Sequence, residues 1–121
     1  MSSLTFKCKV RDKYRLDMSW LSKINTSDLS SIKNIKINYG NKFHKLTDLF
    51  LISGNDFKNI KILNSNNKLD NIGNELTNKN ITITGSVGNG LAKNMNDGRI
   101  ILKGNAEKNA CSGMAGGSVF I

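Results

Sequence analysis

Few side chains in this 121-residue sequence have the chemistry needed for catalysis or metal binding. Its two cysteines, Cys8 and Cys111, lie near opposite ends of the chain, and the single histidine, His44, is far from both. A zinc site needs closely spaced Cys or His pairs. We therefore expect each cysteine to be a buried or half-buried thiol, His44 to be a surface side chain, and no metal to be bound.

Other arrangements that support catalysis are also missing from the sequence. It contains no carboxylate pair at a suggestive spacing and no Ser/His/Asp arrangement. The glycines Gly85, Gly88 and Gly90 could cradle a phosphate if a helix followed them, but no helical pattern does. The sequence predicts no catalytic residue, no cofactor bound by this chain and no independent enzyme.

The charge of the chain is strongly positive, with 18 Lys and Arg against 9 Asp and Glu. These basic residues are spread along the chain without a dense block, and no standard nucleic-acid signature is present. The excess of Lys over Arg, the abundance of Asn and the absence of Pro indicate an AT-rich coding bias. We expect a solvated basic surface and no nucleic-acid partner. A functional patch for an acidic partner or an anionic cofactor is the alternative.

The sequence offers no means of crossing or reaching a membrane. No apolar run approaches the roughly 20 residues that span a bilayer. Residues 1–4 lack the basic start and apolar stretch of a signal peptide. We expect a cytoplasmic protein, in which a disulfide between Cys8 and Cys111 would be out of place.

Residues 1–59 show mixed local signals. Residues 4–10 alternate strictly between apolar and polar types, which predicts a half-buried strand. Residues 26–28, Thr-Ser-Asp, supply a helix N-cap signal. The alternation in residues 35–46, interrupted by Gly40 and Asn41, predicts a hairpin. We interpret this region as an N-terminal cap with a hairpin and short helical turns.

Residues 60–121 repeat at a fixed offset. Residues 81–85 match residues 100–104 nineteen positions later, and the same offset carries Met95 onto Met114. A constant period indicates stacked repeats. The sequence therefore predicts a mainly β fold. Residues 60–121 would form a right-handed parallel β-helix, or solenoid, of about 19 residues per coil, open at the C-terminus and capped by an α+β or all-β segment within one domain.

Residues one period apart would stack because neighbouring strands lie about 4.8 Å from each other. The predicted core columns consist of Ile81, Ile83, Met95, Ile100, Leu102, Met114, Val119 and Ile121. Structural glycines are expected at the corners, where a side chain is excluded: Gly85, Gly88, Gly98, Gly104, Gly113, Gly116 and Gly117.

These repeats carry a glycine-rich motif, in residues 85–88 followed by 95–102, and again in residues 104–107 followed by 114–121. The motif resembles the repeat region shared by the β-solenoid subunit of formylmethanofuran dehydrogenase and the C-terminal domain of the glutamate synthase large subunit. Residues 32–50 and 72–76 are similar to the entry segment and first coil of the former, so the resemblance covers residues 30–121. Glu107 and Asp97 depart from it by replacing glycines.

The resemblance implies a non-catalytic scaffold subunit in an oxidoreductase complex that reduces carbon dioxide to the formyl group of formylmethanofuran in methanogenic archaea. A molybdenum or tungsten pterin would be held by a partner subunit. Relatives carry further coils, so we expect residues 100–121 to dock on other subunits of that complex or on a second copy. Two alternatives are a glutamate-synthase-like spacer module and a basic protein that binds RNA or an acidic surface.

Overall fold

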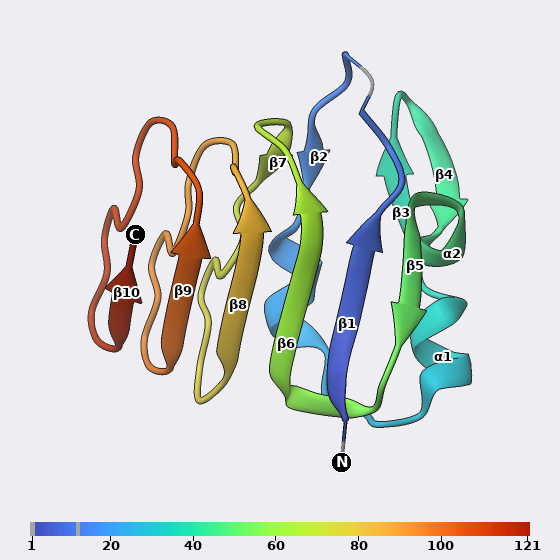
Figure 1. Cartoon of the computed structure of the whole chain (residues 1–121), viewed down its shortest axis with the longest axis horizontal. Helices are drawn as coiled ribbons and strands as arrows, with labels where there is room; N and C mark the ends of the chain where they lie inside the picture. Colours follow the sequence, from blue (N-terminus) through green and yellow to red (C-terminus); the bar gives the residue numbers. More distant parts are fainter. Residues whose placement is uncertain (1, 12) are drawn as a thin grey trace.

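The structure is a computed structural model that describes residues 2–11 and 13–121 (Figure 1). Its strands are β1 (Ser3–Cys8), β2 (Leu16–Asp17), β3 (Lys36–Tyr39), β4 (Lys42–Lys45), β5 (Phe50–Ser53), β6 (Asp56–Ser65), β7 (Leu69–Asp70), β8 (Asn80–Gly85), β9 (Arg99–Lys103) and β10 (Ser118–Phe120). Its helices are the 3-10 helix η1 (Ser19–Lys23) and the short α-helices α1 (Leu29–Lys33) and α2 (Leu46–Leu49).

Six strands form the main sheet, in the order β10-β9-β8-β6-β1-β5. All neighbours in it are parallel except β1 and β5, which are antiparallel. The pairs β2–β7 and β3–β4 form two further sheets of two strands each. Strand β1 lies between β5 and β6 in the main sheet, so this sheet runs across residue 60 and joins the two regions distinguished in the sequence.

Strict alternation of side chains gives the main sheet one buried and one open face. In β1, for example, Leu4, Phe6 and Cys8 are buried whereas Lys7 is exposed. The buried face packs against the rest of the chain, where Trp20 of η1 meets Phe6 with the ring centroids 5.6 Å apart. Helix η1 lies behind the sheet in Figure 1, so the core fills the space between the sheet and the segments behind it.

The connections between β7, β8, β9 and β10 are irregular turns that bond to one another through their backbones. The N–H of Ala92 donates to the carbonyl of Ile72 (2.8 Å), and the N–H of Cys111 donates to that of Leu91 (2.7 Å). Left-handed backbone is frequent in these turns and in others. Asparagine tolerates that conformation, and six asparagines with positive φ adopt it: Asn41, Asn64, Asn71, Asn78, Asn94 and Asn109. The abundance of asparagine therefore has a conformational cause besides any coding bias.

The prediction of a mainly β, right-handed parallel β-helix with an N-terminal cap is wrong. The chain is instead a small mixed α/β domain with three sheets and short helices. One large mixed sheet is present, and the layer behind it consists mostly of turns rather than further long strands. The physical reason is that residues 71–79, 86–98 and 104–117 contain repeated left-handed residues, which break extended backbone.

Local signals in the N-terminal half correspond well to what is observed. Strands β3 and β4 form an antiparallel hairpin in which Ile37 pairs with His44. Asp28 caps α1, because its carboxylate accepts a hydrogen bond from the N–H of Ser30 (3.2 Å). Strands β2 and β5, and the insertion of β1 between β5 and β6, have no counterpart in the predicted cap.

Candidate functional site

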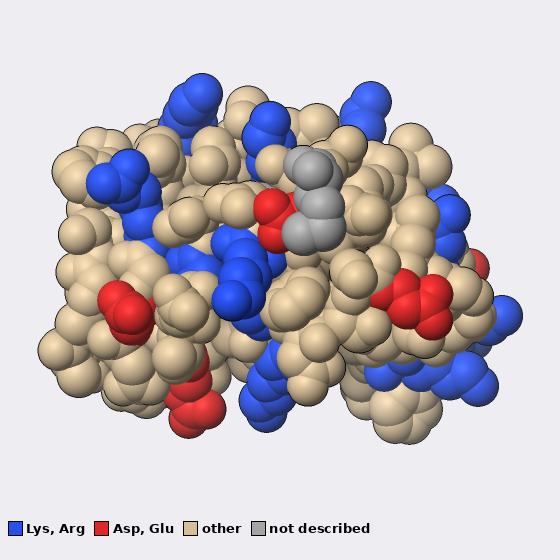
Figure 2. Space-filling model, turned by 90° about the horizontal axis from the view of Figure 1, so that it is seen from below, with Lys and Arg blue, Asp and Glu red and all other residues tan. Residues whose placement is uncertain are grey.

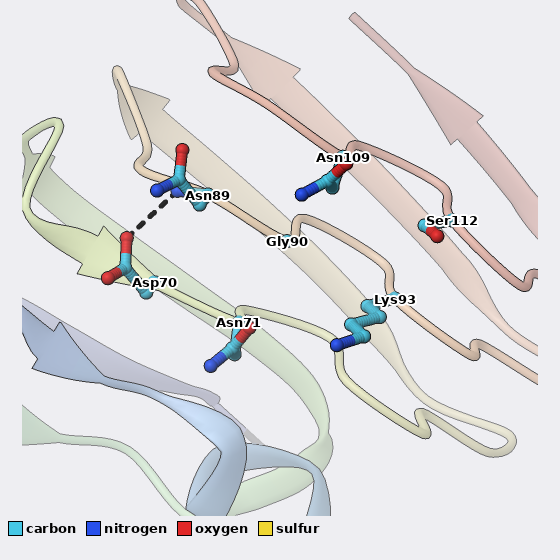
Figure 3. A pocket seen from close by; sticks show the side chains of 7 residues that line it. All are labelled: Asp70, Asn71, Asn89, Gly90, Lys93, Asn109 and Ser112. Carbon is cyan, nitrogen blue, oxygen red and sulfur yellow. Dashed lines mark hydrogen bonds between the residues drawn. The ribbon is translucent and has the colours of Figure 1, made fainter.

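The candidate site is a polar groove of about 390 Å³ that crosses the stacked turns. Figure 3 shows the side chains that line it: Asp70, Asn71, Asn89, Gly90, Lys93, Asn109 and Ser112. All seven belong to three series whose members are nineteen positions apart: Asp70 and Asn89; Asn71, Gly90 and Asn109; Lys93 and Ser112. The groove is thus built by successive turns that each contribute equivalent positions.

Side-chain hydrogen bonds connect these turns. Asp70 Oδ1 accepts from the backbone N–H of Asn89 (2.8 Å), the contact dashed in Figure 3. One period later, Asn89 Oδ1 accepts from the N–H of Lys108 (3.2 Å). Each bond satisfies a backbone donor that would otherwise be unpaired at the turn. These side chains therefore serve first to stack the turns.

The carboxylate of Asp70, the acidic group of the groove, already binds Arg15, which does not line the groove. Arg15 bonds both oxygens of Asp70, through Nε and Nη2, each at 2.7 Å. The bidentate pair places the positive charge of the guanidinium beside the Asp70 carboxylate, and an oxygen of Glu107 lies 3.7 Å from Nη2 of the same guanidinium. The pKa of Arg15 is raised, chiefly by its hydrogen bond to Asp70. Asp70 is consequently a poor candidate for a general base.

The remaining groove side chains favour binding over catalysis. They offer amides, the hydroxyl of Ser112 and the ammonium of Lys93. A serine nucleophile needs a base within hydrogen-bond reach, and the sole histidine lies in β4, outside the groove lining. The amide, hydroxyl and ammonium groups of the lining can hold a polar group through hydrogen bonds.

His44, Cys8 and Cys111 are not brought together around a common site. His44 stacks edge-on against Tyr39 with the centroids 6.1 Å apart, and its Nδ1 is 4.0 Å from an oxygen of Asp48. Cys8 is buried in β1, where burial raises the pKa of its thiol. Cys111 is half-buried in the turn before β10. Among residues 2–11 and 13–121, no group of three or more His, Cys, Asp or Glu side chains could hold a metal ion.

The residues expected in core columns lie in the following places. Ile81 pairs with Ile100, and Ile100 pairs with Val119, in three adjacent parallel strands. Ile83 pairs with Leu102, and both are buried. Met95 is fully buried and Met114 partly so. Ile121 differs from the expectation: it is 68% exposed, because it lies beyond the end of β10.

The expected structural glycines occupy places where backbone or side-chain atoms of a neighbouring segment leave no room for an added Cβ. Gly104 is the clearest case of close approach, since a Cβ there would overlap the carbonyl of Gly85. Gly98 has a φ of 111°, which L-residues rarely adopt, and a Cβ on it would overlap the carbonyl of Lys79. Overlaps with neighbouring turns are found for the others as well: Gly85, Gly88, Gly113, Gly116 and Gly117. None of them lines a phosphate site before a helix.

On the face shown in Figure 2, several Lys and Arg side chains adjoin one another in a short run from one side toward the middle, and the others are separate. Asp and Glu side chains lie on both sides of this run. A nucleic-acid surface concentrates positive charge along an extended path, and a short run flanked by carboxylates does not by itself define such a surface. In the part of the chain that the structure describes, no helix is long and apolar enough to span a bilayer.

These features define a small mixed α/β domain with a polar groove built from stacked turns. No family model matches the sequence, and no curated protein matches it. The fold is similar to a chain in the crystal structure of the formyltransferase/hydrolase complex (FhcABCD) from Methylorubrum extorquens in complex with methylofuran. The TM-score is 0.82 at 23% sequence identity, and the match covers 95% of this chain and 44% of that chain. The two therefore share a fold, and this chain spans less than half the length of its structural neighbour.

Proposed function

We propose that this protein is a non-catalytic scaffold subunit of a formylmethanofuran dehydrogenase-type complex, which reduces carbon dioxide to the formyl group of formylmethanofuran. The single observation that carries the proposal is the structural likeness to a chain of a formyltransferase/hydrolase complex over 95% of the present chain. A fold shared at this level transfers architecture more readily than chemistry. A structural role is the part of the neighbour's function that architecture alone can support.

The composition of the candidate site supports the non-catalytic half of this proposal. The groove carboxylate, Asp70, is neutralised by Arg15, and no base faces Ser112 among the groove-lining residues. Molybdenum or tungsten pterin chemistry would then belong to a partner subunit. This chain would contribute surfaces that hold the catalytic subunits in place.

Residues 100–121 supply a surface on which partners can dock. Strand β10 is the last strand of the main sheet, so its outer edge has no neighbouring strand. Phe120 and Ile121 are 54% and 68% exposed. Exposed apolar edge strands readily pair with another chain. We expect another subunit of the complex, or a second copy, to cover this edge in the working protein.

The proposal is tested by isolating the chain from its native host under mild conditions and identifying the proteins that co-purify in stoichiometric amounts. We expect pterin-enzyme and amidohydrolase-like subunits. Glutaminase and flavin domains would instead support the glutamate-synthase-like spacer and contradict the proposal. The isolated chain should show no formylmethanofuran turnover and retain no stoichiometric metal, so one tightly held ion per chain would also count against it.

A further inference from the structure

The open face of the main sheet has a chemical pattern that neither the groove nor the strand edge explains. Side chains in register on neighbouring strands point to the same side. Lys61 is paired with Thr82, Thr82 with Ile101, and Ile101 with Phe120, so these four lie in one row across the open face. Lys7 lies in a second row between Leu51 and Leu63.

Positive charge dominates this face. Four cations belong to it, and all are exposed: Lys7, Lys61, Arg99 and Lys103. Within the six strands of the main sheet, as the structure describes them, the sole acidic residue is Asp56, at the first position of β6. Its carboxylate accepts a hydrogen bond from the side chain of Asn59 (2.7 Å). The cations of the open face thus stand without a carboxylate beside them in the strands.

Exposed apolar side chains lie beside these cations. Leu51 is 58% exposed and Leu63 is 36% exposed, on either side of Lys7. Phe120 is 54% exposed and lies 5.7 Å from the guanidinium of Arg99. Exposed apolar groups grouped with charges of one sign are typical of a protein interface.

We propose that the open face of the main sheet docks on a flat, acidic protein surface, whose carboxylates meet Lys7, Lys61, Arg99 and Lys103. The inference rests on the proposed scaffold function and names the chemistry of the partner. Carboxylates would neutralise the four cations, and the apolar groups beside them would pack on the partner's aliphatic surface.

Two other occupants fit this face less well. A second copy of the chain would bring cation against cation, which opposes association. A single-stranded nucleic acid needs aromatic side chains on which its bases stack. Phe120 is the aromatic residue on this open face, it lies at the edge, and Arg99 already contacts it. A phosphate backbone offers no apolar group on which Leu51 and Leu63 could pack.

The size of the face indicates how far the interface must reach. Six strands about 4.8 Å apart and about five residues long cover roughly 24 Å by 17 Å, or on the order of 400 Å². A standard interface buries about 800 Å² on each partner. The open face therefore supplies about half of a stable interface, and the contact should continue over the edge of β10.

Zero-length carbodiimide crosslinking of the native complex tests the proposal, because it joins a lysine amine to a carboxylate in direct contact. Mass spectrometry should find Lys7, Lys61 and Lys103 joined to Asp or Glu residues of one partner polypeptide. Lys36, exposed in β3 on a different sheet, is the control and should not be joined to that polypeptide. Crosslinks from Lys36 but from none of the three sheet lysines would overturn the proposal.

A matched pair of variants adds a second measurement. Lys61→Glu should weaken the association about tenfold or more, because it places like charges together, whereas Lys36→Glu should leave it unchanged. Raising the salt concentration should weaken the wild-type complex. Equal affinity of Lys61→Glu and wild type would contradict the inference, provided that circular dichroism shows both to be folded.

The remaining outcomes separate this inference from the proposed function. Loss of the association on nuclease treatment, or crosslinks between two copies, would overturn the acidic protein partner. Sheet-lysine crosslinks to a partner outside a formyl-transferring complex would leave the docking face standing and reject the proposed function. Crosslinks to subunits of a formyl-transferring complex through other faces alone would support the proposed function and reject the docking face.

Discussion

Lys79 is a buried cation that forms no salt bridge with a carboxylate among residues 2–11 and 13–121. Its ammonium donates to the backbone carbonyls of Ser22, at 2.8 Å, and of Ile24, and it lies 5.8 Å from the ring centroid of Phe57. Burial lowers the pKa of Lys79 from its ordinary value of 10.5. The side chain thus ties the C-terminal end of η1 to the residue before β8, although burial disfavours its charged form.

This arrangement predicts a pH-dependent stability difference. The unfolded chain keeps its proton on Lys79 at higher pH than the folded chain does, so the burial penalty disappears as pH rises toward 10.5. The unfolding free energy of the wild type minus that of Lys79→Met should therefore increase with pH over that range, measured by denaturant titration. The unfolding free energy of the wild type minus that of Lys93→Met, which replaces an exposed lysine, should not change with pH over that range. A difference for Lys79→Met that is constant or falls with pH would contradict the burial argument.

Leu102 tests the packing of the strands that repeat at nineteen residues. It is 4% exposed and pairs with Ile83 in the neighbouring strand. Leu102→Ala should lower the unfolding free energy by about 2–5 kcal/mol, because it leaves a cavity in the core. Lys103→Ala, the exposed next position, should change it by less than about 0.5 kcal/mol. Comparable losses for the two variants would show that Leu102 is not a core residue.

At the scale of elements, the turns behind the sheet determine how the strands stack. Their backbone repeatedly enters the left-handed region, in which glycine and asparagine are tolerated best. Some of these positions carry neither residue: Glu75, Ala92 and Cys111 have φ values of 58°, 59° and 62°. Such positions hold local strain that the hydrogen bonds between turns must overcome.

Glu75 is exposed, so its strain can be relieved without disturbing the core. Glu75→Gly should raise the unfolding free energy by about 0.5–1 kcal/mol, the left-handed cost less the added chain entropy of glycine. The control is Lys93→Gly, an exposed turn position without positive φ, which should lower stability by a similar amount. If both variants are destabilised alike in thermal unfolding, the left-handed backbone is not a source of strain.

At the scale of the whole molecule, the two edge strands of the main sheet differ in direction and length. Strand β5 runs antiparallel beside β1 at one edge, whereas β10 has three residues and exposes Phe120 at the other. The open face and the β10 edge meet at Phe120, so one partner could cover both. The molecule is therefore asymmetric in what it leaves uncovered.

This asymmetry predicts that the isolated chain associates through β10. Sedimentation velocity should show association that grows with concentration, and the double variant Phe120→Lys/Ile121→Lys should reduce it, because charged edges resist pairing. Phe43→Lys removes an aromatic side chain that is 74% exposed in β4, and it should leave association unchanged. A clean monomer at high concentration, with slow amide exchange throughout residues 100–121, would show that the edge needs no partner.

The groove residues carry a sequence signal that the apolar positions alone do not reveal. The nineteen-residue offset that aligns Ile81 with Ile100 also aligns Asp70 with Asn89. Extended to polar positions from residue 69 onward, the offset places Asp70, Asn89 and Lys108 in one series, and hydrogen bonds connect them in that order. The bidentate contact of Arg15 with Asp70 carries no such signal, because the partners are 55 residues apart in the chain.

Sequence alone determined the features that depend on short-range rules: the alternation in β1, the cap at Asp28, the hairpin of β3 and β4, and the offset between paired strands. Tertiary structure decided the rest. The apolar face of β1 could have packed on several surfaces. Only long-range pairing with β5 and β6 places β1 between them. The turns replaced the expected further strands because left-handed residues act jointly with hydrogen bonds to the next turn. Local patterns report which side of a strand is buried, whereas the partner that buries it is chosen by contacts distant in the chain.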